Sequence, residues 1–257
     1  MRISLIGAGN VAWHLGHAFS SGGVRIQRVM NRGKEAGQAL ARELKTDFVA
    51  DLTFQVDDSE VLILAISDSA ISDVLHMIRS RGAVLVHTAG SIPMDVLKEI
   101  NVHCGVLYPF QTLTRGIVTD LRKVPFCIEA SDKESLETLQ YLATTVSDFV
   151  RVVNSEQRSY LHLAGIILNN FTNHLITLAS DYLEKKHIDR ELILPLIRET
   201  FRKLENISPA EAQTGPARRN NRIILEKHRQ MLEKEPVLKN LYSLISDSII
   251  AYYKMDH

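Results

Sequence analysis

The first residues of the chain contain an apolar segment that runs directly into two closely spaced glycines. Residues 2–6 read as a strand, Gly7 and Gly9 follow, and a helical pattern begins at Val11. A strand that passes through such a turn into a helix is the start of a dinucleotide-binding α/β unit. Gly7 permits the tight turn, and Gly9 lets the backbone approach a pyrophosphate. The alternative reading of the two glycines is a structural turn that binds no ligand. The residues expected at the pyrophosphate are Gly7, Gly9, Asn10, Val11 and Ala12, the last where helix and strand pack closely.

The end of the second predicted strand, residues 24–30, indicates which dinucleotide is bound. A site for NAD places Asp or Glu at this position, whereas Arg suits the 2′-phosphate of NADP. Here Asn31 and Arg32 follow the strand, and the first carboxylate is Glu35. We therefore expect NADP (NADPH) rather than NAD, held by Asn31 and Arg32; a solvated basic turn is the alternative reading.

The composition excludes several other classes of protein. Hydrophobic residues make up 45% of the 257 residues, and 30 basic residues balance 30 acidic ones, which argues against a protein that binds nucleic acid. No apolar run is long enough for a membrane span. The 2 cysteines lack CxxC spacing, so we expect reduced thiols in a cytoplasmic protein. His14 and His17 have no neighbouring ligand residues, and no metal site is expected.

Strand and helix patterns alternate over residues 1–153 and predict a Rossmann-like, doubly wound α/β domain with about eight strands. Continuous apolar runs at 60–66 and 83–87 are typical of strands buried on both faces. Ligands bind at the carboxyl ends of such strands. The residues that follow these strands are therefore expected along the cofactor: Ile66, Ser67, Asp68 and Ala89.

Further polar residues after the strands are candidates for contact with a substrate: Ser91, Tyr108 and Gln111. Alternatives remain for several of them. Asp68 can cap a helix predicted over residues 70–79, Ser91 can cap one over 93–100, and Tyr108 can belong to the core. His87, at the end of its strand, is either a packed residue or a catalytic group.

Residues 154–257 contain helical patterns and no strand pattern, which predicts a separate all-α domain. Ser155 is expected to cap a long helix that runs to about residue 186. Asp189 and Ser208 are expected to cap further helices, and Pro236 separates the last two.

The motifs together resemble a known family. Residues 7–12, 31–32 and 64–68 are similar to the NADP-binding domain of pyrroline-5-carboxylate reductases, β-hydroxyacid dehydrogenases and deazaflavin-dependent NADP reductases. The whole chain resembles NADP oxidoreductases that join a Rossmann-like domain to a C-terminal helical domain of unknown function, through residues 87–93, 108–112, 162–170 and 214–220. The resemblance implies an active site in the interdomain cleft and a homodimer built on the helical domains.

The long helix differs from β-hydroxyacid dehydrogenases, which carry a catalytic Lys one turn before an Asn. Gly165 and Ile166 stand four residues before Asn169 and Asn170, so that mechanism does not carry over. His162 is expected on the same face as Asn169 and can supply a proton, although a packed histidine is the alternative. Asn169 and Asn170 can orient a carbonyl or imine. Arg218 can bind a carboxylate or phosphate of the substrate, or belong to a solvated loop.

We therefore expect an NADP-dependent oxidoreductase that moves a hydride between the nicotinamide and a small carbonyl, an imine or a second redox cofactor. The alternative is an NADP-binding sensor or scaffold that does no hydride transfer.

Overall fold

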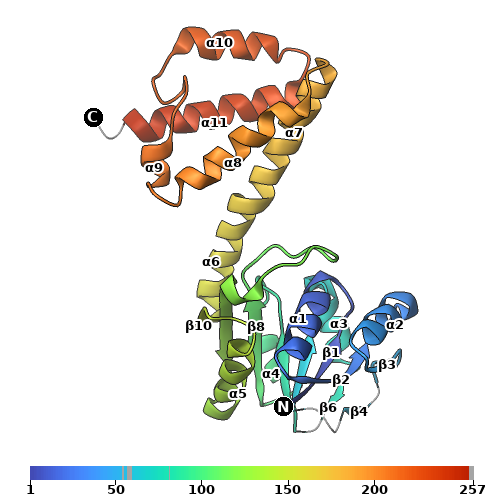
Figure 1. Cartoon of the computed structure of the whole chain (residues 1–257). Coiled ribbons are helices and arrows are strands. Elements are labelled where there is room, and N and C mark those ends of the chain that lie inside the picture. Colours follow the sequence, from blue (N-terminus) through green and yellow to red (C-terminus); the bar gives the residue numbers. More distant parts are fainter. Residues whose placement is uncertain (54, 57–59, 81, 255–257) are drawn as a thin grey trace. The chain divides into compact units, whose positions relative to one another are not determined.

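The computed structural model describes residues 1–53, 55–56, 60–80 and 82–254. Contacts divide the chain into two units, Met1–Phe171 and Thr172–His257 (Figure 1). The boundary expected between residues 153 and 154 coincides with the end of the last described strand, at Val152. The boundary given by the contacts lies later in the chain, because residues 154–171 contact the sheet-containing unit.

The first unit is built on an eight-stranded sheet with the order β10-β9-β8-β7-β5-β1-β2-β3. Neighbouring strands pair in parallel except β8 and β9, which are antiparallel. This order confirms the Rossmann-like sheet. The strands are β1 (Arg2–Ile6), β2 (Arg25–Met30), β3 (Asp47–Val49), β5 (Val61–Leu64), β7 (Val84–His87), β8 (Cys104–Pro109), β9 (Phe126–Ala130) and β10 (Val150–Val152).

Helices cover both faces of this sheet because its central strands are apolar on both sides. In β5, Val61 and Ile63 belong to one buried cluster, and Leu62 and Leu64 belong to the other. Each fully buried side chain of this size contributes about 2 kcal/mol relative to exposure. The first cluster includes residues of α1 (Asn10–Ser21), α2 (Lys34–Glu43) and α5 (Lys133–Thr144), and the second those of α3 (Ile71–Leu75) and α4 (Asp95–Lys98).

Two predicted helices are shorter than their patterns indicated. The segment expected to be helical over 70–79 forms a 3-10 turn at Asp68–Ala70, then α3, and its end becomes strand β6 (Arg79–Ser80). β6 pairs with β4 (Gln55–Val56), and a pairing between distant segments leaves no local pattern. The helix expected over 93–100 is reduced to α4, with Met94 at its N-cap in place of Ser91.

The long helix begins one residue earlier than expected and is not regular. Asn154, rather than Ser155, is the N-cap of α6 (Ser155–Gly165), because Asn154 and Gln157 form a reciprocal capping box. A π-helical segment, Ile166–Phe171, then separates α6 from α7 (Thr172–Lys185). Single π-helical turns occur often at functional sites, and this one carries Asn169 and Asn170.

The described residues of the second unit form helices joined by turns and loops, and no strand. Asp189 caps a 3-10 turn at Arg190–Ile193, and Ser208 caps α9 through a capping box with Glu211, as expected. Among the residues that the structure describes, none of the helices combines the length and apolar character that a membrane crossing requires. The helices of this unit are α7, α8 (Leu194–Lys203), α9 (Pro209–Ala212), α10 (Arg222–Met231) and α11 (Pro236–Lys254).

Candidate functional site

The turn between β1 and α1 has the geometry that its two glycines were expected to provide. Gly7 has a φ of 115°, and a Cβ at this position would lie 2.2 Å from the carbonyl oxygen of Ala65. Its N–H donates to the carbonyl of Met30 at 2.8 Å, which joins the turn to the end of β2. A side chain is therefore excluded at Gly7 by both conformation and space.

Gly9 has the opposite surroundings. A Cβ built on it meets no atom within 4 Å, so the residue faces open space. It is the N-cap of α1, no side chain caps the helix, and no acidic residue lies in the first turn. The first N–H groups of α1 and the positive end of its dipole are thus available to an anion.

A cavity of about 400 Å³ lies over this turn. It brings together eight of the residues predicted to hold the cofactor: Gly7, Gly9, Asn10, Val11, Asn31, Arg32, Ile66 and Ser67. Leu52, Ala70 and Val74 also line it and were not predicted. Ala12 does not line the cavity and is fully buried, which fits its expected role in close packing.

Asp68 and Ala89 also lie outside the lining of that cavity. Asp68 accepts a short hydrogen bond from the hydroxyl of Ser91, which joins the loop after β5 to the loop after β7. The side chains of Asp68 and Ser91, both considered as helix caps, therefore bind each other. Ala89 is buried, and its N–H donates to Nδ1 of His87 at 3.1 Å.

His87 is a packed residue. It is fully buried, and burial, followed by the nearby charge of Arg158, lowers the pKa of its imidazole to about 4. The ring is neutral at physiological pH and accepts the N–H of Ala89, so it supports the loop after β7.

Arg115 was not singled out in the sequence, and it fastens a distant loop to the glycine turn. Its backbone N–H donates to Oδ1 of Asn10 at 3.2 Å, and its guanidinium pairs with Glu43 at 2.8 Å. Glu43 also accepts from Trp13 and His17. Burial raises the pKa of Glu43, but these hydrogen bonds outweigh burial and hold the pKa below its ordinary value. No sequence motif marks this cluster, because its members come from three segments.

A second cavity, of about 380 Å³, contains most of the residues predicted to contact substrate. Tyr108 and Gln111 come from the end of β8 and the loop after it, and His162, Asn169 and Asn170 come from α6 and the π-helical segment. All of these residues belong to the first unit. Gln111 accepts the N–H of Thr112, and Asn169 donates to Asn170 at 3.2 Å; both asparagines are exposed.

His162 and Tyr108 form the polar centre of this second cavity. The Tyr108 hydroxyl lies 3.2 Å from Nδ1 of His162. Burial raises the pKa of Tyr108 to about 12, so the phenol stays protonated at neutral pH; it can donate to Nδ1 of His162 or accept from it, depending on the tautomer of the ring. The His162 ring packs on Gly90, where a Cβ would lie 2.5 Å from Nδ1. The loop after β7 therefore contacts the histidine directly.

Arg218 lies in the second unit. Its guanidinium stacks 4.0 Å above the ring of Tyr253, and the Tyr253 hydroxyl donates to the carbonyl of Ala210 at 2.7 Å. The stacking gives the residue a structural role, and its contact with a substrate stays a prediction. Among the described residues, no group of three or more His, Cys, Asp or Glu side chains is placed to hold a metal ion.

Comparison with known proteins matches the two parts of the chain to two different family models and the whole chain to solved structures. Residues 2–90 match the model of the family described as NADP oxidoreductase, coenzyme F420-dependent, and residues 124–249 match a domain of unknown function, DUF2520. The crystal structure of a "putative NADP oxidoreductase" from Bacteroides fragilis is 40% identical, with coverage of 97% of this chain and 98% of that one and a TM-score of 0.92.

Two more distant structures share the fold. A protein from Thermotoga maritima is 20% identical, with 99% of each chain covered and a TM-score of 0.75. An imine reductase from Myxococcus stipitatus, solved with NADP+, is 19% identical, with 99% of this chain and 93% of that one covered and a TM-score of 0.58. No curated protein matches the sequence significantly.

Proposed function

We propose, on the premise that this chain belongs to the family of NADP oxidoreductases with a C-terminal domain of unknown function, that it uses NADPH to reduce a small carbonyl or imine. The observation that carries the proposal is the placement of two sites on linked loops. The Gly7–Gly9 turn and Arg32 line one cavity, and the Tyr108–His162 pair lies in another, beside Gly90. The bond between Asp68 and Ser91 connects the loops that border them.

The residues of the first cavity fit NADPH. The open space at Gly9 and the uncapped start of α1 suit the pyrophosphate. Arg32 and Asn31 follow β2, where the 2′-phosphate of an adenine ribose is recognised. Asn31 is already ordered, because its amide donates to the carbonyl of Gly33 at 2.7 Å. When bound, NADPH supplies a hydride, and a second redox cofactor such as a flavin is the alternative acceptor.

His162 has the role of proton donor in this proposal. Reduction of a C=O or C=N bond adds a hydride to carbon and a proton to oxygen or nitrogen. In protonated His162 both ring nitrogens are donors; Nδ1–H donates to the Tyr108 oxygen, so Nε2–H is the group left to give a proton to the substrate. Asn169 and Asn170, which line the same cavity, would orient the reacting group.

The proposal is tested by following NADPH oxidation with a panel of cyclic imines, ketones, ketoacids and flavins. We expect turnover with at least one carbonyl or imine, and His162→Gln should lower kcat by about 100-fold while the Kd for NADPH stays within about twofold. His103→Gln is the matched control, because His103 precedes β8 at the opposite end of the strand from Tyr108. Tight binding of NADPH without turnover of any compound would instead favour a sensor or scaffold.

We also propose that the helical unit pairs with a second copy of the chain. In α7 and α8 no residue is buried, whereas Leu192, Leu196 and Phe201 are large apolar residues that are exposed. Exposed apolar surface of this kind is typical of interfaces between subunits. Light scattering during size-exclusion chromatography should give a dimer mass, and Leu196→Asp should shift it toward the monomer. A monomeric wild type would contradict the proposal.

A further inference from the structure

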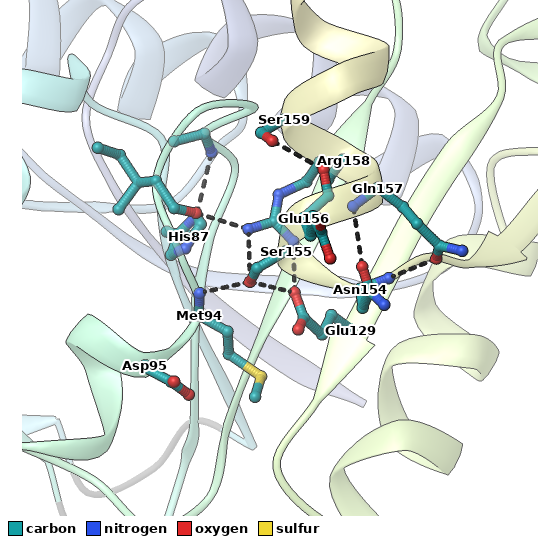
Figure 2. A network of polar contacts seen from close by, with 12 residues as sticks. His87, Met94, Asp95, Glu129, Asn154, Ser155, Glu156, Gln157, Arg158 and Ser159 are labelled. Carbon is teal, nitrogen blue, oxygen red and sulfur yellow. Dashed lines mark hydrogen bonds and ion pairs between the residues drawn. The ribbon is translucent and has the colours of Figure 1, made fainter.

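Arg158 in α6 is a charged residue whose side chain is 1% exposed. Its guanidinium forms an ion pair with Glu129 of β9, and it donates to the carbonyl of Ile92 at 2.5 Å and to the hydroxyl of Ser155 at 3.1 Å (Figure 2). Nε has no hydrogen-bond partner among the described residues. A buried ion pair is rarely the most stabilising choice, since apolar residues of similar size do as well or better. Its presence therefore calls for a role beyond stability.

The network joins three elements of the first unit. Ser155 donates to Glu129 at 2.8 Å and accepts the N–H of Met94 at 2.9 Å. Figure 2 shows the side chains of Arg158, Ser155 and Glu129 lying close together, with Met94 beside Ser155. The first turn of α6 is thereby fastened to β9 and to the loop after β7.

Helix α6 and the loop after β7 meet again one turn further along the helix. His162 follows Arg158 by four residues, so both lie on the same side of α6. The loop after β7, which Arg158 holds through Ile92, also contains Gly90, on which the His162 ring packs. Arg158 and His162 thus contact one loop from successive turns of one helix.

We propose that Arg158 is a positioning residue. Through Glu129, Ser155 and the carbonyl of Ile92, it fixes α6 in the position in which His162 contacts Tyr108 and Gly90. The inference rests on the proposed function, in which His162 donates a proton to the substrate. A displacement of about 1 Å at a reacting group costs on the order of 100-fold in rate, so a fixed helix matters more for turnover than for stability.

The charge of Arg158 supports the same loop in a second way. After burial, it is the next cause of the lowered pKa of His87. The ring thus stays neutral and keeps accepting the N–H of Ala89, the residue before Gly90. Both effects act on the loop against which His162 packs.

The test uses the full chain and compares variants that remove the pair in different ways. Arg158→Met alone leaves Glu129 without its partner, so the double variant Arg158→Met/Glu129→Gln, which removes both charges together, is the main probe. Arg158→Lys keeps the charge without the planar fork and should restore part of the function. Arg151→Met is the matched control, because Arg151 lies on the edge strand β10 and stacks over Phe149.

The first readout is independent of turnover. With ¹⁵N-labelled histidine, the ring signals of His162 in the wild type, assigned by their loss in His162→Gln, should show one predominant tautomer with Nδ1 in a hydrogen bond. In the folded double variant we expect these signals to shift toward a tautomer mixture, while the Kd for NADPH stays within about twofold. With a substrate in hand, kcat should fall by about 10- to 100-fold and KM for NADPH should hardly change.

Unchanged His162 signals in the folded double variant would overturn the proposal, and so would an unchanged kcat. If the double variant does not fold, Arg158→Lys decides the matter by the same two readouts. Failure of the proposed function would give a different result. The wild type would then fail to oxidise NADPH with any compound of the panel, while the NMR comparison would still report on the position of His162.

Discussion

Gly7→Ala is expected to lower the free energy of unfolding by on the order of 3 kcal/mol or more. The φ of 115° is unfavourable for a residue with a Cβ, and that Cβ would lie 2.2 Å from the carbonyl oxygen of Ala65. Ala65 is buried directly after β5, and its N–H donates to the carbonyl of Ile6, so its backbone has little freedom to move away. Urea unfolding followed by circular dichroism measures the loss.

Gly9→Ala is the matched control, because it adds the same methyl group two residues away. Open space surrounds that position, so the loss of stability should be limited to about 1 kcal/mol, the cost of Ala in place of Gly at an N-cap. Binding of NADPH should nevertheless weaken about tenfold or more, because the added Cβ occupies the path by which a pyrophosphate approaches the backbone. Equal NADPH affinity in Gly9→Ala and the wild type would place the pyrophosphate elsewhere.

Arg32→Asp is expected to raise the Kd for NADPH by about 100-fold and the Kd for NADH by less than threefold. A charge-assisted pair with the 2′-phosphate contributes about 1.5–3 kcal/mol, and the new carboxylate would repel that phosphate. NADH lacks the group and should lose little. Quenching of Trp13, the one tryptophan of the chain, and calorimetric titration both measure the affinities.

Arg25→Asp provides the control for this substitution. It makes the same charge change on β2, at the start of the strand rather than after its end. We expect both Kd values to stay near those of the wild type. Should Arg32→Asp bind NADPH as well as Arg25→Asp does, the assignment of Arg32 to the 2′-phosphate would be wrong.

The Rossmann-like part of the chain could be predicted from local patterns because each signal lies within a few residues. The strand, the glycines and the helix of residues 2–21 are consecutive, and their backbone geometry follows from residue type alone. The buried strands were recognisable because strands covered on both faces are continuously apolar. The eight-stranded sheet therefore agrees with the sequence interpretation, and eight of the residues predicted at the cofactor line one cavity.

The polar centre of the second cavity depends on contacts between segments far apart in the chain. Tyr108 and His162 are 54 residues apart, and their hydrogen bond exists only because α6 returns to the carboxyl end of β8. The helix caps predicted at Ser91 and Ser155 were wrong for the same reason: Ser91 binds Asp68, and Ser155 binds Arg158 and Glu129 instead of capping α6.

Sequence by itself determined that the chain has a glycine turn between a strand and a helix, a basic residue after its second strand and a helical C-terminal part. Those properties follow from backbone preferences and from periodic burial, which act locally. Only the tertiary structure decided which polar side chains meet. Arg158 reads in the sequence as an ordinary helix cation, and the packing of α6 on β9 and the loop after β7 makes it the buried centre of a network. Burial and hydrogen-bond partners are set by distant segments, and no local pattern records them.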